Sequence, residues 1–339
     1  MPMLEVKDLH TSFFTPAGEV KAVNGISFNL DHGKVLGIVG ESGSGKSVTA
    51  YSVMQILEKT GKIVSGSIKF DGQELVGAGE KVMKTIRGNK ISIIFQDPMT
   101  SLNPTYTVGR QLMEAIMLHT DRDKKQAYER AVEMLRLVNV NEPEKRMKQY
   151  PFEFSGGMRQ RVMIAMALAC RPKILIADEP TTALDVTIQA QILRLMNDLQ
   201  REKGTSIIFI THDLGVINEM ADDVAVMYCG QVVEKADART IFGNPEMSHP
   251  YTEGLMASIP RLDAVGSKIE PIPGVVPHPL NLPKGCKFAP RCKYCTGKCL
   301  EQEPPLTDVG NGQLIRCFYP NKEVRNSAEH KEITVHHES

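Results

Sequence analysis

The most informative eight residues of this chain read Gly40-Glu41-Ser42-Gly43-Ser44-Gly45-Lys46-Ser47, and they match the pattern G-x-x-x-x-G-K-[ST] at every fixed position. Apolar residues 35–39 precede the octet with strand character, and residues 48–57 can continue it as a helix. Its glycines let backbone N–H groups turn toward phosphate oxygens, and a helix start adds its positive dipole end. We therefore predict a nucleotide-phosphate loop, in which Lys46 reaches the β- and γ-phosphates and Ser47 binds Mg²⁺. A Gly/Ser loop with an incidental lysine is the alternative.

Composition narrows the class of protein. The chain has 339 residues, a length that favours two structural units, and its 40 basic and 40 acidic residues cancel. No overall positive field exists to draw the protein onto nucleic acid, so we expect no nucleic-acid partner. Residues 1–10 contain Glu5 and Asp8 and lack the apolar core of a secretory signal, so we expect a cytoplasmic protein. The longest apolar run, residues 162–170, is too short to span a bilayer, so any membrane association must come through partners.

Polar side chains follow three apolar runs that have the pattern of buried strands. Gln96 follows residues 91–95, Asp178-Glu179 follows residues 174–177, and His212 comes shortly after residues 206–210. Ligands of open α/β sheets bind at the carboxyl ends of the strands. We predict that Gln96 touches Mg²⁺ or the attacking water, that Asp178 holds Mg²⁺ and that Glu179 polarises the water. His212 could contact a γ-phosphate, although a lone histidine after a strand is more often structural, and Gln96 in an ordinary turn is the corresponding alternative.

A second anion site is predicted at Ser155-Gly156-Gly157, which stands at the start of a long apolar helix. Unpaired N–H groups at a helix start point outward and can bind phosphate. Taken alone, the tripeptide is equally well a helix N-cap with a flexible approach. The sequence between Gln96 and Ser155 has helical periodicity from residue 109 to residue 140, which predicts a mostly helical insertion.

The N-terminal residues 3–34 alternate between apolar and polar side chains, with turn signals at 16–18 and 31–33. This pattern predicts a small β-layer that leads into the octet. Phe13 and Phe14 lie in it, and an aromatic face there can stack on an adenine ring. Core packing is the alternative, and only one of the two needs to face a nucleotide.

Taken in this order, the motifs resemble the nucleotide-binding subunit of ABC transporters over about residues 3–245. The resemblance implies an α/β P-loop NTPase of the ABC ATPase type, with an N-terminal β-subdomain and an α-helical subdomain at about residues 97–165. It implies these roles: Phe13 stacks on adenine, Gln96 is the Q-loop glutamine, Glu179 the catalytic base, Asp185 the D-loop aspartate and His212 the switch histidine. Met158 replaces the glutamine that commonly closes the signature, but the phosphate contacts come mainly from Ser155 and the Gly156-Gly157 backbone.

More narrowly, residues 95–104, residues 155–161 and the tail resemble the D-type ATPase of bacterial oligopeptide and dipeptide importers. The resemblance implies that two homologous ATPase subunits, in a heterodimer, enclose ATP and Mg²⁺ and drive peptide import through two transmembrane permease subunits. An extracytoplasmic peptide-binding protein takes part indirectly, and the ATPase lies at the cytoplasmic face of the membrane. Nickel importers share much of the pattern and are the alternative. A soluble ABC ATPase without a transport role is a weaker rival, since such proteins usually carry two nucleotide domains or a long coiled-coil insert.

The C-terminal part, residues 246–320, is predicted to be a second unit. Five prolines between residues 271 and 283 enforce an extended strap, which leads into a loop-rich segment containing Cys286, Cys292, Cys299 and Cys317. Four thiolates in such a segment can hold Zn²⁺ or an iron–sulfur cluster, and their spacing does not decide between them. Free buried cysteines are a further alternative.

Resemblance to the peptide-importer ATPases, where this quartet carries a [4Fe–4S] cluster, favours iron, with zinc as the alternative. Cys295 is an extra thiol that leaves the choice of the third ligand open. The cysteines are far in sequence from every predicted phosphate-contacting residue, so we expect a mainly structural role. Residues 321–339 are charged and are expected to be disordered.

Overall fold

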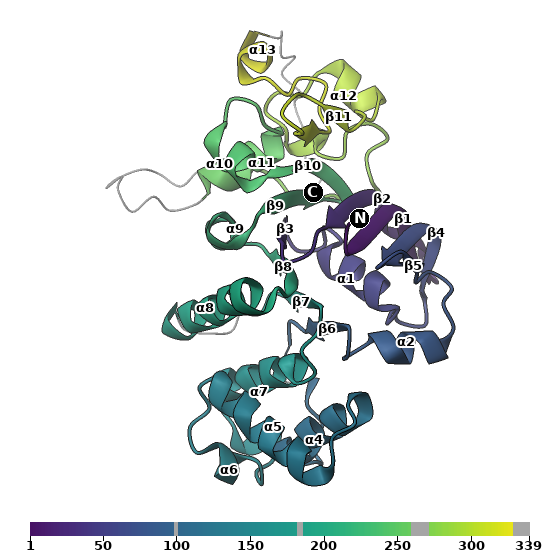
Figure 1. The fold of residues 1–339 in the computed structure, drawn as a ribbon. Coiled ribbons are helices and arrows are strands. Elements are labelled where there is room, and N and C mark those ends of the chain that lie inside the picture. The colour runs from purple at the N-terminus through teal and green to yellow at the C-terminus, as the bar shows by residue number, and fades with distance from the viewer. Residues whose placement is uncertain (98–100, 182–185, 259–270, 328–339) are drawn as a thin grey trace.

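The computed structural model describes residues 1–97, 101–181, 186–258 and 271–327 (Figure 1). Its N-terminal part is a four-stranded antiparallel sheet in the order β2-β1-β4-β5. Side chains of the first strand, among them Leu4, Val6 and Leu9, are buried against the rest of the body, with an irregularity in the pairing between Val6 and Leu9. The predicted β-layer is therefore confirmed, with strands β1 Leu4–Thr15, β2 Gly18–Leu30, β4 Gly61–Phe70 and β5 Gln73–Glu74.

A second sheet forms the centre of the molecule, in the order β11-β12-β10-β9-β3-β8-β7-β6. Neighbouring strands from β9 to β6 run parallel, whereas β10 and β12 are antiparallel to their neighbours. Every residue of β3, β7 and β8 is buried, which agrees with their largely apolar sequences. The strands are β3 Val35–Val39, β6 Ile91–Ile94, β7 Ile174–Asp178, β8 Ser206–Thr211, β9 Asp223–Tyr228, β10 Gln231–Asp237, β11 Thr307–Asp308 and β12 Leu314–Ile315.

Helices pack on this central sheet and join it to the N-terminal layer. The connection from β9 to β10 is a hairpin turn, in which Cys229 and Gly230 both adopt positive φ angles, 45° and 78°. The helices of this part are α1 Lys46–Met54, α2 Glu80–Ile86, α8 Val186–Lys203, α9 Leu214–Met220 and α10 Ala238–Gly243.

The predicted helical insertion forms a separate group of helices, drawn at the foot of Figure 1. Its helices pack through buried apolar side chains such as Leu112, Ala131 and Leu135. Arg161, in the helix of residues 156–168, joins that helix to the segment after residue 137. Its Nη1 donates to the carbonyl oxygens of Val138 at 3.0 Å and Asn139 at 2.7 Å. The elements are α4 Val108–His119, α5 Lys124–Leu137, α6 Pro143–Arg146, the 3₁₀ turn η1 Pro151–Glu153 and α7 Gly156–Leu168.

The C-terminal part, predicted as a second unit, packs on the nucleotide-binding body. Its strand β12 pairs with β10 and so extends the central sheet, with Ile315 opposite Glu234 and Leu314 opposite Lys235. Tyr251 and Phe288 belong to the main hydrophobic core. The loop-rich segment therefore shares the hydrophobic core of the nucleotide-binding body. Its helical elements are α11 Pro250–Ala257, η2 Ala289–Arg291, α12 Gly297–Glu301 and α13 Lys322–Ser327.

The expectation of disorder from about residue 321 is wrong for the residues up to 327. Helix α13 forms there, and its Arg325 is fully buried. Arg325 Nη1 donates to the carbonyl oxygen of Ser248 at 2.6 Å, and Nη2 lies 3.2 Å from Glu253 Oε2. A charged side chain can be buried when it is paired in this way, which composition alone does not reveal.

Candidate functional site

The octet forms the loop between β3 and α1, as predicted, and two of its glycines are required by close backbone contacts. A Cβ atom on Gly40 would lie 2.2 Å from the carbonyl oxygen of Met227, and one on Gly45 would lie 2.4 Å from that of Ala22. Gly45 also has a φ of 98° and serves as the N-cap of α1. Any larger residue would push the loop out of its position against β2 and β9.

Lys46 is buried inside this loop. Its Nζ donates to the carbonyl oxygens of Gly40 at 2.7 Å and Glu41 at 3.0 Å. Burial lowers the pKa of Lys46, although the carboxylates of Glu179, Asp178 and Glu41 act in the opposite direction. The ammonium group of Lys46 is therefore surrounded by backbone carbonyl oxygens of the loop and by nearby carboxylates.

Asp178 and Ser47 meet at the end of β7. The Ser47 hydroxyl donates to Asp178 Oδ1 at 3.0 Å, and Asp178 is fully buried. Its other oxygen, Oδ2, has no described donor in good hydrogen-bonding geometry, although the Tyr51 hydroxyl also acts on this carboxylate and opposes the rise in its pKa. Burial raises the pKa of Asp178, while the hydrogen bond from Ser47 opposes the rise. A buried carboxylate oxygen without a well-placed donor, next to a hydroxyl, has the chemistry of a Mg²⁺ site, so these residues fit the ion.

The side chain of Glu179, just after the end of β7, is approached by side chains that follow two other strands. Gln96 Nε2 donates to Glu179 Oε2 at 3.1 Å, and His212 Nδ1 lies 3.5 Å from the same oxygen. The backbone of Glu179 has a φ of 46°, a left-handed conformation that is uncommon outside glycine and is held by the hydrogen bond from its N–H to the carbonyl oxygen of Ile210. Such local strain is typical of functional sites. The structure thus brings together the three residues for which sequence predicted catalytic roles.

Ser155-Gly156-Gly157 begins α7 in the helical group, whereas α1 packs by the N-terminal sheet (Figure 1). The Ser155 hydroxyl accepts from the N–H of Met158 at 3.4 Å, and Ser155 and Gly156 are exposed. The N-cap prediction is confirmed, and the anion-binding role stays a prediction. Asp185, predicted as the D-loop aspartate, lies outside the described residues.

Phe13 and Phe14 lie in different surroundings on β1. Phe13 is half-buried, and a Cβ atom added to Gly61 would lie 2.9 Å from its ring. Phe14 is 48% exposed, with Lys62 Nζ 5.9 Å from its ring centre. The assignment of Phe13 to adenine stays a prediction, and the structure offers Phe14 as the more accessible ring.

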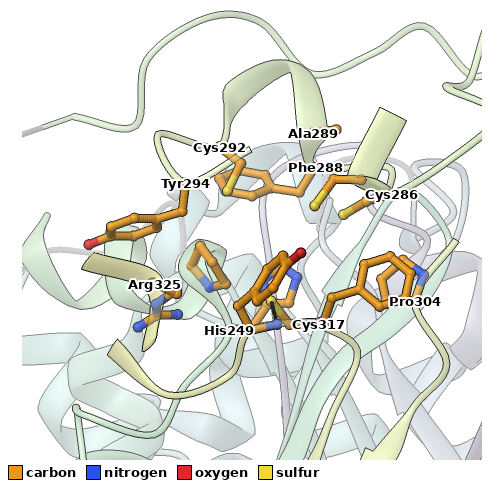
Figure 2. A pocket seen from close by; sticks show the side chains of 13 residues that line it. His249, Cys286, Phe288, Ala289, Cys292, Tyr294, Pro304, Cys317 and Arg325 are labelled. Carbon is orange, nitrogen blue, oxygen red and sulfur yellow. Dashed lines mark hydrogen bonds between the residues drawn. The ribbon is translucent and has the colours of Figure 1, made fainter. Parts of the chain in front are cut away.

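The four predicted cysteine ligands line one pocket in the C-terminal part. Figure 2 shows Cys286 and Cys292 on one side of it and Cys317 on the other. Cys299 also lines this pocket, whereas Cys295 is absent from its lining. Apolar and aromatic side chains supply most of the remaining wall. Within the described ranges, no group of three or more His, Cys, Asp or Glu side chains is arranged to hold a metal ion.

One contact was missed by sequence reasoning. The loop residue Glu41 binds Tyr251 and Arg291 of the C-terminal part, and Arg291 directly precedes Cys292. The cysteines are far from the phosphate loop in sequence, but the residue before Cys292 contacts that loop. Arg291 lies 250 positions from Glu41, and no motif links the two positions.

Comparisons with known proteins agree with this geometry. The family model described as "ABC transporter" matches residues 23–182, and the model "Oligopeptide/dipeptide transporter, C-terminal region" matches residues 233–299. The chain is 54% identical to the oligopeptide transport ATP-binding protein OppD of Salmonella typhimurium, over 95% of both chains. It is 50% identical to the dipeptide transport ATP-binding protein DppD of Bacillus subtilis, over 96% of this chain and 97% of the relative.

Among solved structures, the dimeric ATP-binding cassette MJ0796 bound to ADP and Pi matches with a TM-score of 0.64 and 26% identity. The match covers 70% of this chain and 99% of that one. In the described part of the chain, no helix combines the length and the apolar character needed to cross a membrane.

Proposed function

The chain belongs to the ATP-binding proteins of oligopeptide and dipeptide ABC transporters, and on that premise we propose that it hydrolyses ATP to drive the import of di- or oligopeptides. The observation that carries the proposal is the convergence of Gln96, Glu179 and His212 at one oxygen beside the phosphate loop. Three side chains from separate strand ends meet where an attacking water would be activated. The peptide cargo is supported by the names of the relatives.

The residues divide the work of hydrolysis by their positions. Glu179 Oε2 would accept the proton of the attacking water, with Gln96 and His212 orienting it from either side. Lys46 would exchange its bonds to two loop carbonyls for bonds to phosphate oxygens. Ser47 and Asp178 would hold Mg²⁺, which supplies neutralisation of phosphate charge.

We infer that the complete site forms between two ATPase subunits. Ser155 and Gly156 are exposed at the start of a 13-residue helix, so their N–H groups are available to phosphates held by another subunit. The MJ0796 cassette was solved as a dimer with bound ADP and Pi, which supports the same arrangement here. A homologous second ATPase would complete a heterodimer.

We propose that the helical subdomain contacts two transmembrane permease subunits at the cytoplasmic face of the membrane. Its helix α4 presents Met117 and Leu118 with exposed fractions of 42% and 75%. Exposed apolar side chains next to one another favour a protein contact. The extracytoplasmic peptide-binding protein would act through the permeases.

We also propose that Cys286, Cys292, Cys299 and Cys317 bind a [4Fe–4S] cluster and form a cysteine-rich module, with zinc as the alternative. Four thiols that line one pocket are a suitable ligand set for either. Anaerobically purified protein should then be brown, with iron matched by acid-labile sulfide. Stoichiometric zinc without sulfide would overturn the cluster proposal.

The transport function is tested by reconstituting the chain with its partner ATPase and permeases in lipid vesicles that carry the peptide-binding protein. ATP hydrolysis should rise when oligopeptides are added, and labelled peptide should accumulate only with ATP. Stimulation by Ni²⁺ and not by peptides would contradict the proposed cargo. The isolated chain should hydrolyse ATP slowly, and a rate independent of protein concentration and partner would contradict the two-subunit site.

A further inference from the structure

The C-terminal part holds the phosphate loop at one residue, Glu41, through both its backbone and its side chain. The Tyr251 hydroxyl accepts a hydrogen bond from the N–H of Glu41 at 2.7 Å. Arg291 donates from Nη1 to Glu41 Oε2 at 2.5 Å and from Nη2 to Oε1 at 3.0 Å. A two-pronged contact between guanidinium and carboxylate fixes direction as well as distance.

Both holding side chains are themselves fixed by their surroundings. Tyr251 is fully buried, with its ring centre 4.7 Å from that of Tyr228 and 5.5 Å from that of Phe288. The Arg291 side chain is 4% exposed, and its Nε donates to the carbonyl oxygen of Pro273 at 2.9 Å. Glu41 therefore binds to groups that are already in place, so the contact costs little conformational entropy.

The contact reaches the phosphate-binding groups through the carbonyl oxygen of Glu41. That oxygen accepts from Lys46 Nζ at 3.0 Å and from the N–H of Ser44 at 3.2 Å. Gly40 precedes Glu41 and Gly43 follows it closely, and glycine gives a loop many accessible conformations. A fixed Glu41 limits these conformations and keeps the N–H groups and Lys46 where phosphates will bind.

Charge gives a second reason for the contact. An unpaired carboxylate in a loop that binds a triphosphate would repel it, and the repulsion is strong at short range in a partly buried site. The Glu41 side chain is only 29% exposed, and Arg291 neutralises it. Arg291 therefore both shapes the loop and removes a charge that opposes nucleotide binding.

We propose that Arg291 and Tyr251 are positioning residues for ATP binding, which act through Glu41 to hold the phosphate loop in its binding conformation. This inference rests on the proposed ATPase function. Arg291 ends η2 and directly precedes Cys292 of the cysteine pocket.

The test measures the dissociation constant of a fluorescent ATP analogue for the full-length chain and its variants, together with ATP hydrolysis by the assembled transporter. Arg291→Ala should weaken binding by about tenfold, because it leaves the Glu41 carboxylate unpaired near the phosphates. The hydrolysis rate at saturating ATP should stay within about twofold of wild type, since the catalytic groups are untouched. Tyr251→Phe, which keeps the ring, should weaken binding about threefold through the loss of one hydrogen bond.

Lys293→Ala is the matched control. It removes a neighbouring cation of the same segment, whose partner is Glu253 at 3.1 Å and which does not contact the loop. Its dissociation constant should equal that of wild type. A double-mutant cycle shows whether the effect passes through Glu41: Arg291→Ala should have little further effect in a Glu41→Ala background.

The inference is overturned if Arg291→Ala and Tyr251→Phe both bind the analogue within twofold of wild type, or if the effects of Glu41→Ala and Arg291→Ala are additive. Should Arg291→Ala fail to fold, the binding result for Tyr251→Phe alone decides whether the inference holds, because that variant removes only the hydroxyl oxygen that contacts Glu41. The binding readout separates this inference from the transport function. A chain that loses ATP affinity as described but supports no peptide import would contradict only the latter.

Discussion

The phosphate loop and the cysteine pocket lie on the two sides of one contact, yet they are stabilised differently. In the loop, Lys46 and Ser47 already have protein partners, and glycines fit against neighbouring carbonyl oxygens. In the pocket, the four sulfurs share an apolar cavity, and burial raises the pKa of Cys292 to about 12 and that of Cys317 to about 11. Burial thus favours neutral thiols at these two positions, whereas a hydrogen bond with Cys295 lowers the pKa of Cys299 to about 5. A bound metal would favour thiolates. The loop is built in advance of its ligand, whereas the pocket would gain stability from the metal proposed for it.

The largest effect is expected at the preformed site. Glu179→Gln should lower ATP hydrolysis by the assembled transporter at least about a hundredfold, because the base is lost. ATP affinity should be retained, since the loop is untouched, whereas Lys46→Ala should weaken ATP binding. Steady-state hydrolysis and nucleotide binding check both points. A Glu179→Gln transporter that hydrolyses ATP near the wild-type rate would show that another group is the base.

Rigidity of the loop is tested by Gly45→Ala. The added Cβ atom would lie 2.4 Å from the carbonyl oxygen of Ala22, at a φ of 98°, so we expect a loss of about 1–3 kcal/mol in the free energy of unfolding and weaker ATP binding. Gly43→Ala is the control, because it shares a positive φ of 77° but its Cβ would meet nothing within 4 Å. Denaturant unfolding compares the two. Equal losses would mean that backbone conformation alone, and not the close contact, requires glycine at position 45.

Dependence of the pocket on its ligand is tested by Cys299→Ser. We expect loss of the proposed metal and a lower melting temperature. Because Arg291 directly precedes Cys292, we also expect ATP affinity to weaken by about threefold. The control is Cys295→Ser, since Cys295 does not line the pocket and the metal should remain. Metal analysis and nucleotide binding give the result. Metal loss in Cys295→Ser alone would show that the third ligand is Cys295.

The smallest effect concerns the adenine end of the site. If Phe13 stacks on adenine, Phe13→Ala should weaken ATP binding by about threefold to tenfold, the range expected for an aromatic contact. Phe14→Ala should then have little effect. The reverse result would assign the adenine contact to the more exposed ring, which Lys62 approaches.

The strand-end residues could be predicted from the sequence because the carboxyl ends of parallel strands share one edge of a sheet. Gln96 and His212 follow two such strands and meet at Glu179, which follows a third. The left-handed backbone of Glu179 could not be predicted, since nothing in the residue type requires a φ of 46°. It follows from the hydrogen bond to Ile210 on the neighbouring strand.

Contacts between single side chains that are far apart in the sequence could not be predicted from it. Arg325 looks like part of a charged tail, and only the fold places Ser248 and Glu253 around it. The two-residue strand β12 is too short to give a periodic pattern, so its pairing with β10 was invisible in the sequence.

That short pairing has a consequence for how the protein is made. Strand β10 exposes one edge until β12 joins it, and an open edge is a template for pairing with other chains. Because a chain is synthesised from its N-terminus, the nucleotide-binding body leaves the ribosome with this edge uncovered until Leu314 and Ile315 emerge. A product truncated near residue 245 would keep every catalytic residue named here and would be prone to aggregate. A strand of two residues, synthesised late, thus protects the body that precedes it from pairing with other chains.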